Sequence, residues 1–267
     1  MPFFRQGPQG IFKTLLVFLF CSTANFAEPF LDVETLPMLR TKQYPIGNFD
    51  KILVYSAPRT GSSLLYNVLR FLFEKADHLS RPHNRFYQDC SVLKTHRAEE
   101  RDLLKDQHVL YVVPIRNPLQ ACISIYRISQ SPFKNQQQWC KKIMDSQAQT
   151  LQYAEKRKEK GQKVLILKYE DFENNIDHLF NLIEETFSLS ISELDKETMR
   201  AGYRKENIYA NTLPLANFSE FLPISGFHGQ HVSLGNFTPP SHVLTWLNQS
   251  LLDVLPLFQK HGYFNEK

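Results

Sequence analysis

The chain has few of the residues that define several large protein classes. Its 267 residues include only 4 cysteines, and they contain neither an internal repeat nor a low-complexity stretch, which argues against large disordered regions. Lys and Arg (31) outnumber Asp and Glu (27) by only 4 charges, and the dense basic run is the short KRKEKGQK at 156–163. We interpret that run as a solvated helix end, so the composition gives no case for nucleic acid as a partner.

Cysteine is too sparse and too irregularly spaced to indicate a disulfide framework or a zinc site. Cys21 lies in an apolar N-terminal segment, which leaves Cys90, Cys122 and Cys140, an odd number. Cys122 falls within an apolar helical pattern and is predicted to be a buried thiol.

The N-terminus carries a hydrophobic run that is too short to span a bilayer comfortably. This run, LLVFLF at 15–20, follows two basic residues and precedes the small residues Ala24 and Ala27. The three-part pattern predicts a secretory signal peptide over residues 1–27, with cleavage after Ala24 or Ala27, and an exported single domain of residues 28–267. A short membrane anchor and a merely hydrophobic N-terminus are the alternatives.

Four apolar runs are predicted to form a central parallel sheet, because their continuous hydrophobicity is typical of strands that are covered on both faces. They lie at residues 51–57, 90–96, 108–116 and 163–169. Helical patterns lie at 62–76, 118–129, 136–160, 173–187 and 242–260. The alternation predicts an α/β fold of three layers, with helices on both faces of the sheet. Residues 208–240 are predicted to be long surface loops.

A strand, a turn and a helix follow one another in LVYSAPRTGSSLLYNVLRFLFE, residues 53–74. Such a junction offers free backbone N–H groups and the positive end of a helix dipole, and therefore predicts an anion site. Gly61 allows close approach of a ligand, Ser62 and Ser63 can donate hydroxyls, and Arg59 can bind a phosphate or sulfate with two hydrogen bonds. The lysine of a Walker A loop is absent, because Ser62 occupies its place, and this argues against a standard ATPase. An ordinary junction with Ser62 as helix cap is the alternative.

Three more motifs end strands of the predicted sheet. In VLKTHRAEE, Lys94 and His96 point to the same side of a strand, with His96 as a candidate general base and Lys94 as an electrostatic stabiliser. In YVVPIRNPLQACISIYR, Arg116 ends a strand at a second strand-to-helix junction, and Ser124 lies two turns along that helix. In VLILKYEDF, Tyr169 can stack on a base or bury its ring. Surface decoration, a plain helix start and a core ring are the respective alternatives.

In this order the motifs resemble those of the sulfotransferase family that uses 3′-phosphoadenosine 5′-phosphosulfate (PAPS), over residues 51–171. The resemblance implies a P-loop nucleotide-kinase-like fold. KTH resembles the Lys-Thr-His of the cytosolic branch, which implies that His96 is the catalytic base and that Lys94 acts beside it. SAPRTGSSLL resembles the family's 5′-phosphosulfate loop, which implies catalytic charge stabilisation by Arg59 and binding of the donor's 5′ end by a set of five residues. These are Arg59, Thr60, Gly61, Ser62 and Ser63.

The resemblance extends to the other end of the donor. Arg116 and Ser124 keep the eight-residue spacing of the family's 3′-phosphate motif, and Tyr169 is similar to the tyrosine that lies near the adenine. The chain departs from the family where HGQHVSLGNF replaces an Arg-Lys-Gly loop near the C-terminus. There His228 and His231 stand in place of strong cations, which implies a weaker grip on the 3′-phosphate at neutral pH.

The resemblance therefore implies an enzyme that moves a sulfuryl group from PAPS to a hydroxyl of an acceptor by in-line displacement, without a metal. The acceptor is expected to be set by the loops at 79–88, 130–139 and 209–227. A kinase-like nucleotide-binding protein of the same fold is the first alternative, although the chain lacks both a Gly-Lys-Ser/Thr triplet and an obvious metal-binding aspartate. An inactive secreted binding protein is the second.

Overall fold

The computed structural model describes residues 30–82, 85–104, 107–128, 133–229, 232 and 237–264. The predicted signal peptide, residues 1–27, lies outside the described residues, and so does His231. Within the described part of the chain, no helix combines the length and the apolar character needed to cross a membrane.

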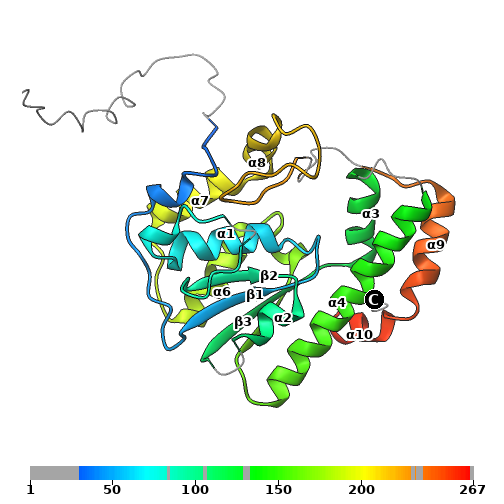
Figure 1. The fold of residues 1–267 in the computed structure, drawn as a ribbon, viewed down its shortest axis with the longest axis horizontal. Helices are drawn as coiled ribbons and strands as arrows, with labels where there is room; N and C mark the ends of the chain where they lie inside the picture. The colour runs from blue at the N-terminus through cyan, green and yellow to red at the C-terminus, as the bar shows by residue number, and fades with distance from the viewer. Residues whose placement is uncertain are drawn as a thin grey trace, which may run out of the picture.

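Four parallel strands form one sheet in the order β2-β1-β3-β4 (Figure 1). They are β1 (Lys51–Tyr55), β2 (Val92–Thr95), β3 (Val109–Ile115) and β4 (Val164–Lys168). All four predicted strands are confirmed, each within its predicted bounds. Because β1 pairs with both β2 and β3, the winding of the chain reverses at β1. The carboxyl ends beside such a reversal are where open α/β sheets bind ligands.

Helices cover both faces of this sheet, which confirms the three-layer α/β prediction. Ile52 and Val54 point into a core that is shared with α1 and α6, whereas Leu53 and Tyr55 point into a second core shared with α4 and α10. Figure 1 shows α1 and α7 on one side of the sheet and α4 and α10 on the other. The helices that bound these layers are α1 (Ser62–Phe73), α2 (Ala98–Asp102), α3 (Pro118–Ile128), α4 (Phe133–Glu159), α5 (Tyr169–Phe172), α6 (Ile176–Phe187), α7 (Glu193–Tyr203), α8 (Lys205–Thr212), α9 (Ser241–Leu251) and α10 (Leu255–Lys260), with short 3-10 turns at Leu36–Leu39 and Ala76–His78.

Three predictions of secondary structure need correction, one of a loop and two of helices. The predicted loop at 208–240 is wrong at its start, because α8 continues to Thr212. The side chains of Asn207 and Asn211 there hydrogen-bond to the backbone of Leu31, a contact across the chain that no local pattern announces. The predicted helix at 173–187 begins only at Ile176, and the one at 242–260 is divided into α9 and α10.

The three described cysteines are free thiols in the interior, and the prediction of a buried Cys122 is confirmed. Cys122 on α3 and Cys140 on α4 each direct the sulfur at the carbonyl oxygen of the other residue, at 3.6 and 3.8 Å. These contacts join the two helices, so α3 is held firmly against α4.

A polar cluster, the Glu74 cluster, ties the end of α1 to the amino end of β2; Glu74 and His78 in it are buried, whereas Arg81 is partly exposed and Asp89 is exposed. It comprises Glu74, His78, Arg81 and Asp89. The Glu74 carboxylate accepts the N–H groups of Ser91 and Val92 at 3.2 and 3.0 Å and lies 3.0 Å from the Nδ1 atom of His78, while Arg81 and Asp89 pair at 2.7 Å. Glu74, His78 and Cys90 have ligand atoms within 4.8 Å of one another, as in a metal site. Because backbone N–H groups already occupy the carboxylate, we interpret the cluster as a structural connection.

Candidate active site

The carboxyl ends of the strands open into a cavity of 1020 Å³. Every predicted site residue lines this cavity except Thr60, so the sheet gathers motifs that lie more than a hundred positions apart in the sequence. Thr60 is fully buried, and its hydroxyl donates a hydrogen bond to the carbonyl of Ala57 at 2.9 Å. Its side chain therefore shapes the turn and does not face the cavity.

The turn after β1 has an unusual backbone that brings α1 to the cavity. Arg59 and Gly61 both adopt the left-handed conformation, with φ of 68° and 79°. A Cβ atom on Gly61 would lie 2.0 Å from the ring of Tyr169, so glycine is required there by both the backbone and the space. Gly61 is the N-cap residue and α1 begins at Ser62, so the alternative in which Ser62 caps the helix is wrong. The N–H groups of the first turn of α1 have no partner within the helix and mark an anion site.

His96 is held as a neutral imidazole that can accept a proton. Its Nδ1 atom lies 2.6 Å from the carbonyl oxygen of Ser56, which can only accept a hydrogen bond, so Nδ1 carries the hydrogen. The lone pair is then on Nε2. The surrounding protein, reinforced by the positive charge of Lys94, lowers the pKa of His96 to about 4, although the residue itself is exposed to solvent. The ring is therefore uncharged at neutral pH, as a general base must be before it acts.

Lys94 lies beside this imidazole and shares the end of β2. Its ammonium donates a hydrogen bond to the hydroxyl of Ser63 at 2.8 Å, which connects β2 to the first turn of α1. Burial lowers the pKa of Lys94 to about 7. The amine is therefore divided between its charged and neutral forms near neutral pH, and an anion placed beside it would favour the charged form.

Arg59 connects the turn after β1 with helix α3. Its Nε atom donates to the hydroxyl of Ser124 at 3.2 Å, and Nη2 contacts the same oxygen. Burial and then the charge of Arg116 lower the pKa of Arg59 to about 10. The predicted 5′ and 3′ groups of residues are thus joined into one continuous site, a link that their separation in sequence does not reveal.

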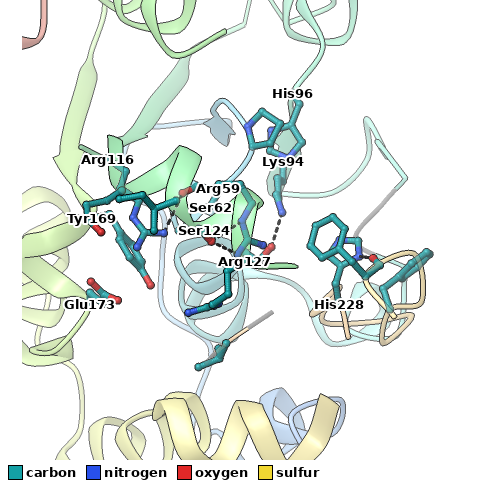
Figure 2. Close-up of a pocket in the computed structure, with 18 of the residues that line it drawn as sticks. Arg59, Ser62, Lys94, His96, Arg116, Ser124, Arg127, Tyr169, Glu173 and His228 are labelled. Atoms are coloured by element: carbon teal, nitrogen blue, oxygen red, sulfur yellow. Dashed lines mark hydrogen bonds between the residues drawn. The ribbon is translucent and has the colours of Figure 1, made fainter. Parts of the chain in front are cut away.

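Arg116 lies against the ring of Tyr169, with its guanidinium carbon 4.6 Å from the ring centre (Figure 2). Its Nε atom is buried and has no hydrogen-bond partner among the described residues. Burial raises the pKa of Tyr169 to about 12, so the phenol is neutral. The tyrosine ring lines the cavity and contacts both Arg116 and the Gly61 turn, so it connects these two parts of the site.

Two site features were not predicted from the motifs. Arg127, one turn after Ser124 on α3, also lines the cavity, and its spacing of three residues from Ser124 was the signal that could have identified it. Glu170 accepts the backbone N–H of Asn117 at 2.8 Å and the hydroxyl of Tyr263 at 2.7 Å. It thereby fixes the junction between β3 and α3, where the side chain of Asn117 accepts the N–H groups of Leu119 and Gln120 in the first turn of the helix.

Aromatic side chains also line the cavity. Phe86, Phe218 and Phe221 are among them, and the ring of His228 stacks on Phe218 with 4.7 Å between the ring centres. Burial and then the charges of Lys94 and Arg59 lower the pKa of His228, so its ring is a weak cation at neutral pH. Figure 2 shows His228 across the cavity from Arg116. Phe227, at the end of the predicted acceptor loop at 209–227, is fully buried in the core.

The charges of the cavity do not balance. Within the described ranges, no Asp or Glu forms an ion pair with Lys94, Arg116 or Arg127. Glu173, which also lines the cavity, pairs with Lys205 at 3.1 Å. Partly buried cations are costly without counter-charges, so this arrangement favours a ligand that carries several negative charges.

No family model matches the chain, and no curated protein matches its sequence. Among solved structures, the fold is similar to that of the mouse sulfotransferase SULT7A1, which was crystallised in complex with PAP. The two sequences are 14% identical, the alignment covers 88% of this chain and 94% of that chain, and the TM-score is 0.49. Similarity of this degree assigns no function to the chain.

Proposed function

We propose that this chain is a sulfotransferase that takes a sulfuryl group from PAPS and transfers it to a hydroxyl of an acceptor. The observation that carries the proposal is the pairing of two features in one cavity. A neutral imidazole, His96, has its lone pair on Nε2. The same cavity is lined by Lys94, Arg116 and Arg127, and none of these three forms an ion pair with an Asp or Glu of the described residues. The first feature suits removal of a proton from a hydroxyl, and the second suits a polyanionic donor.

The residues present fit such a donor. Its 5′ end would be bound by the turn of Arg59 and Gly61 and by the hydroxyls of Ser62 and Ser63, where the first turn of α1 offers backbone N–H groups. Its second phosphate would be bound near Arg116, whose buried Nε atom needs an acceptor. When bound, the donor supplies the sulfuryl group, attached through oxygen to the 5′-phosphate.

The side chains of the protein divide the chemistry between them. His96 accepts the proton of the acceptor hydroxyl at Nε2 as the hydroxyl oxygen attacks sulfur, and the bond from sulfur to the 5′-phosphate oxygen breaks. Lys94 and Arg59 stabilise the negative charge that develops on the oxygens around sulfur. The carbonyl of Ser56 holds Nδ1–H and fixes the tautomer throughout. We place the acceptor against the aromatic side chains that line the cavity, Phe86, Phe218 and Phe221.

A transfer assay tests this proposal. The full chain is incubated with PAPS labelled at sulfur and with a panel of hydroxyl-bearing acceptors, and both labelled product and nucleotide bisphosphate are measured. We expect bisphosphate to be released by the native chain and not by a variant without His96. Transfer of phosphate from ATP in the parallel reaction would favour the kinase-like alternative, and inertness toward both donors would favour a binding protein.

A further inference from the structure

One face of helix α3 forms the floor of the cavity. Gln120, Ile123, Ser124 and Arg127 are three or four residues apart, so they lie on the same side of the helix, and all four line the cavity. Figure 2 shows the Arg127 side chain extending from beside Ser124 toward the part of the site that holds Tyr169 and Glu173. Arg127 therefore presents its charge inside the site.

The charge of Arg127 is opposed by its surroundings. Burial and the neighbouring guanidinium of Arg116 both lower the pKa of Arg127. Within the part of the chain that the structure describes, no carboxylate pairs with it, and Glu173 is paired with Lys205 instead. A helix that places a second guanidinium beside Arg116 without a counter-charge gains nothing in stability from the pair, whereas an anion between the two would remove the repulsion.

Two polar groups near Arg127, those of Ser124 and Arg116, bear on its role in binding an anion. The Ser124 hydroxyl, which the 3′-phosphate motif implies as a ligand, already accepts hydrogen bonds from Arg59. The guanidinium of Arg116 faces the same region with a buried Nε atom that has no partner among the described residues. Arg116 and Arg127 are thus two neighbouring fork-shaped donors, and such groups bind phosphate with two hydrogen bonds each.

We propose that Arg127 is a phosphate-binding residue of this site, and that it acts with Arg116 to select nucleotides that carry a second phosphate in addition to the 5′-phosphate. The inference rests on the proposed function for the identity of the nucleotide. It assigns to α3 the positive charge that the sequence lacks in the segment of His228, where imidazoles stand in place of strong cations.

Two ligands that differ by one phosphate test the proposal. The dissociation constants of adenosine 3′,5′-bisphosphate and of AMP are measured by calorimetry, with competition against the bisphosphate for weak AMP binding, for the full chain and for Arg127→Gln. We expect the substitution to raise the dissociation constant of the bisphosphate about tenfold or more, since charge-assisted bonds are lost, and that of AMP less than about twofold. Arg97→Gln is the matched control, because Arg97 lines the same cavity but is exposed and pairs with Glu100.

The outcomes separate this inference from the proposed function. If the native chain binds the bisphosphate and Arg127→Gln weakens both ligands equally, or neither, the selective role of Arg127 is wrong while the donor site stands. If the native chain does not bind the bisphosphate, the proposed function fails and the inference fails with it. Arg127→Lys keeps the charge without the fork, and about threefold weaker bisphosphate binding with unchanged AMP binding would support the same role should the glutamine variant not fold.

Discussion

Two groups of charged residues lie at opposite edges of the same sheet, and they are built in opposite ways. In the Glu74 cluster at the amino edge, each charged group meets a partner: backbone N–H groups and His78 contact Glu74, and Arg81 pairs with Asp89. In the cavity at the carboxyl edge, Arg116 and Arg127 both line the wall and repel each other, and neither forms an ion pair with a carboxylate of the described residues. The two groups therefore differ in whether their charges are balanced.

The difference separates structure from function. A balanced cluster stabilises the fold, because removal of one member leaves another without its partner. An unbalanced cluster costs stability in the free protein, and the cost is recovered only when a ligand of opposite charge binds. We therefore assign a structural role to the first edge and a binding role to the second, and the following substitutions test that division.

The largest expected effect is on turnover, at the carboxyl edge. His96→Ala removes the acceptor of the hydroxyl proton and should lower the rate of sulfuryl transfer by about 10²–10⁴-fold. Bisphosphate affinity should change less than about threefold, because the imidazole is neutral. His108→Ala is the matched control, since His108 is an exposed histidine bound to the carbonyl of Asn48 at the other edge of the sheet. Equal losses in the two variants would contradict the role of His96.

The next effect is on stability, at the amino edge. Glu74→Gln keeps the shape of the side chain but directs an amide NH₂ at the N–H groups of Ser91 or Val92. It should lower the free energy of unfolding by about 3 kcal/mol. Urea denaturation measures the loss, and Glu193→Gln, which breaks the exposed pair with Arg200, should cost less than about 1 kcal/mol. A Glu74→Gln variant as stable as the native chain would mean that the cluster is not structural.

A substitution of Arg116 should show the reverse behaviour. Arg116→Gln is expected to weaken bisphosphate binding about 10–100-fold, because a bidentate phosphate contact is lost. The free energy of unfolding of the unliganded variant should lie within about 1 kcal/mol of the native value. The substitution removes the repulsion between Arg116 and Arg127 but also the favourable contact of Arg116 with Tyr169, and these two effects oppose each other. Loss of stability without loss of affinity would place Arg116 in the same class as Glu74.

The smallest effect is a pH dependence that originates in Lys94. Its pKa in the free protein is lowered to about 7, and a bound polyanion raises that pKa, so binding takes up a proton above neutral pH. Bisphosphate affinity should therefore be constant below the lowered pKa and fall about fivefold between roughly pH 7 and 8.5. In Lys94→Met the affinity should be lower and nearly independent of pH over this range. A native profile that rises with pH would show that Lys94 does not face the phosphates.

The sequence predicted the local parts of this architecture better than their connections. The strands and the turn at Gly61 follow from apolar runs and from a glycine that must be left-handed, and both are local signals. Two contacts join distant segments and could not be predicted from a pattern within one motif. They are the hydrogen bond between Arg59 and Ser124 and the packing of Tyr169 on Gly61. The position of Tyr169 near an adenine therefore stays a prediction, whereas its contact with Arg116 was not predicted.

The same reason explains why helix α8 was not predicted from the sequence. Residues of α8 have almost no preferred apolar face, and the helix is held by Asn207 and Asn211, whose side chains bind the backbone of Leu31 at the other end of the described chain. A sequence reading sees asparagines and predicts a loop. Arg127 was missed for a different reason: its spacing from Ser124 was visible, but only the sheet shows that this helix face meets the cavity.

The most direct test of the binding role of the carboxyl edge is a calorimetric titration of the full chain with adenosine 3′,5′-bisphosphate and, separately, with ATP. The cations without ion-pair partners among the described residues, and the buried Nε atom of Arg116 without a described acceptor, predict saturable binding of the bisphosphate. ATP should bind at least about tenfold more weakly, because it has no 3′-phosphate to contact Arg116 and Arg127. Absence of binding by the bisphosphate, or binding of ATP with equal or higher affinity, would contradict the assignment of this edge to a PAPS-type donor.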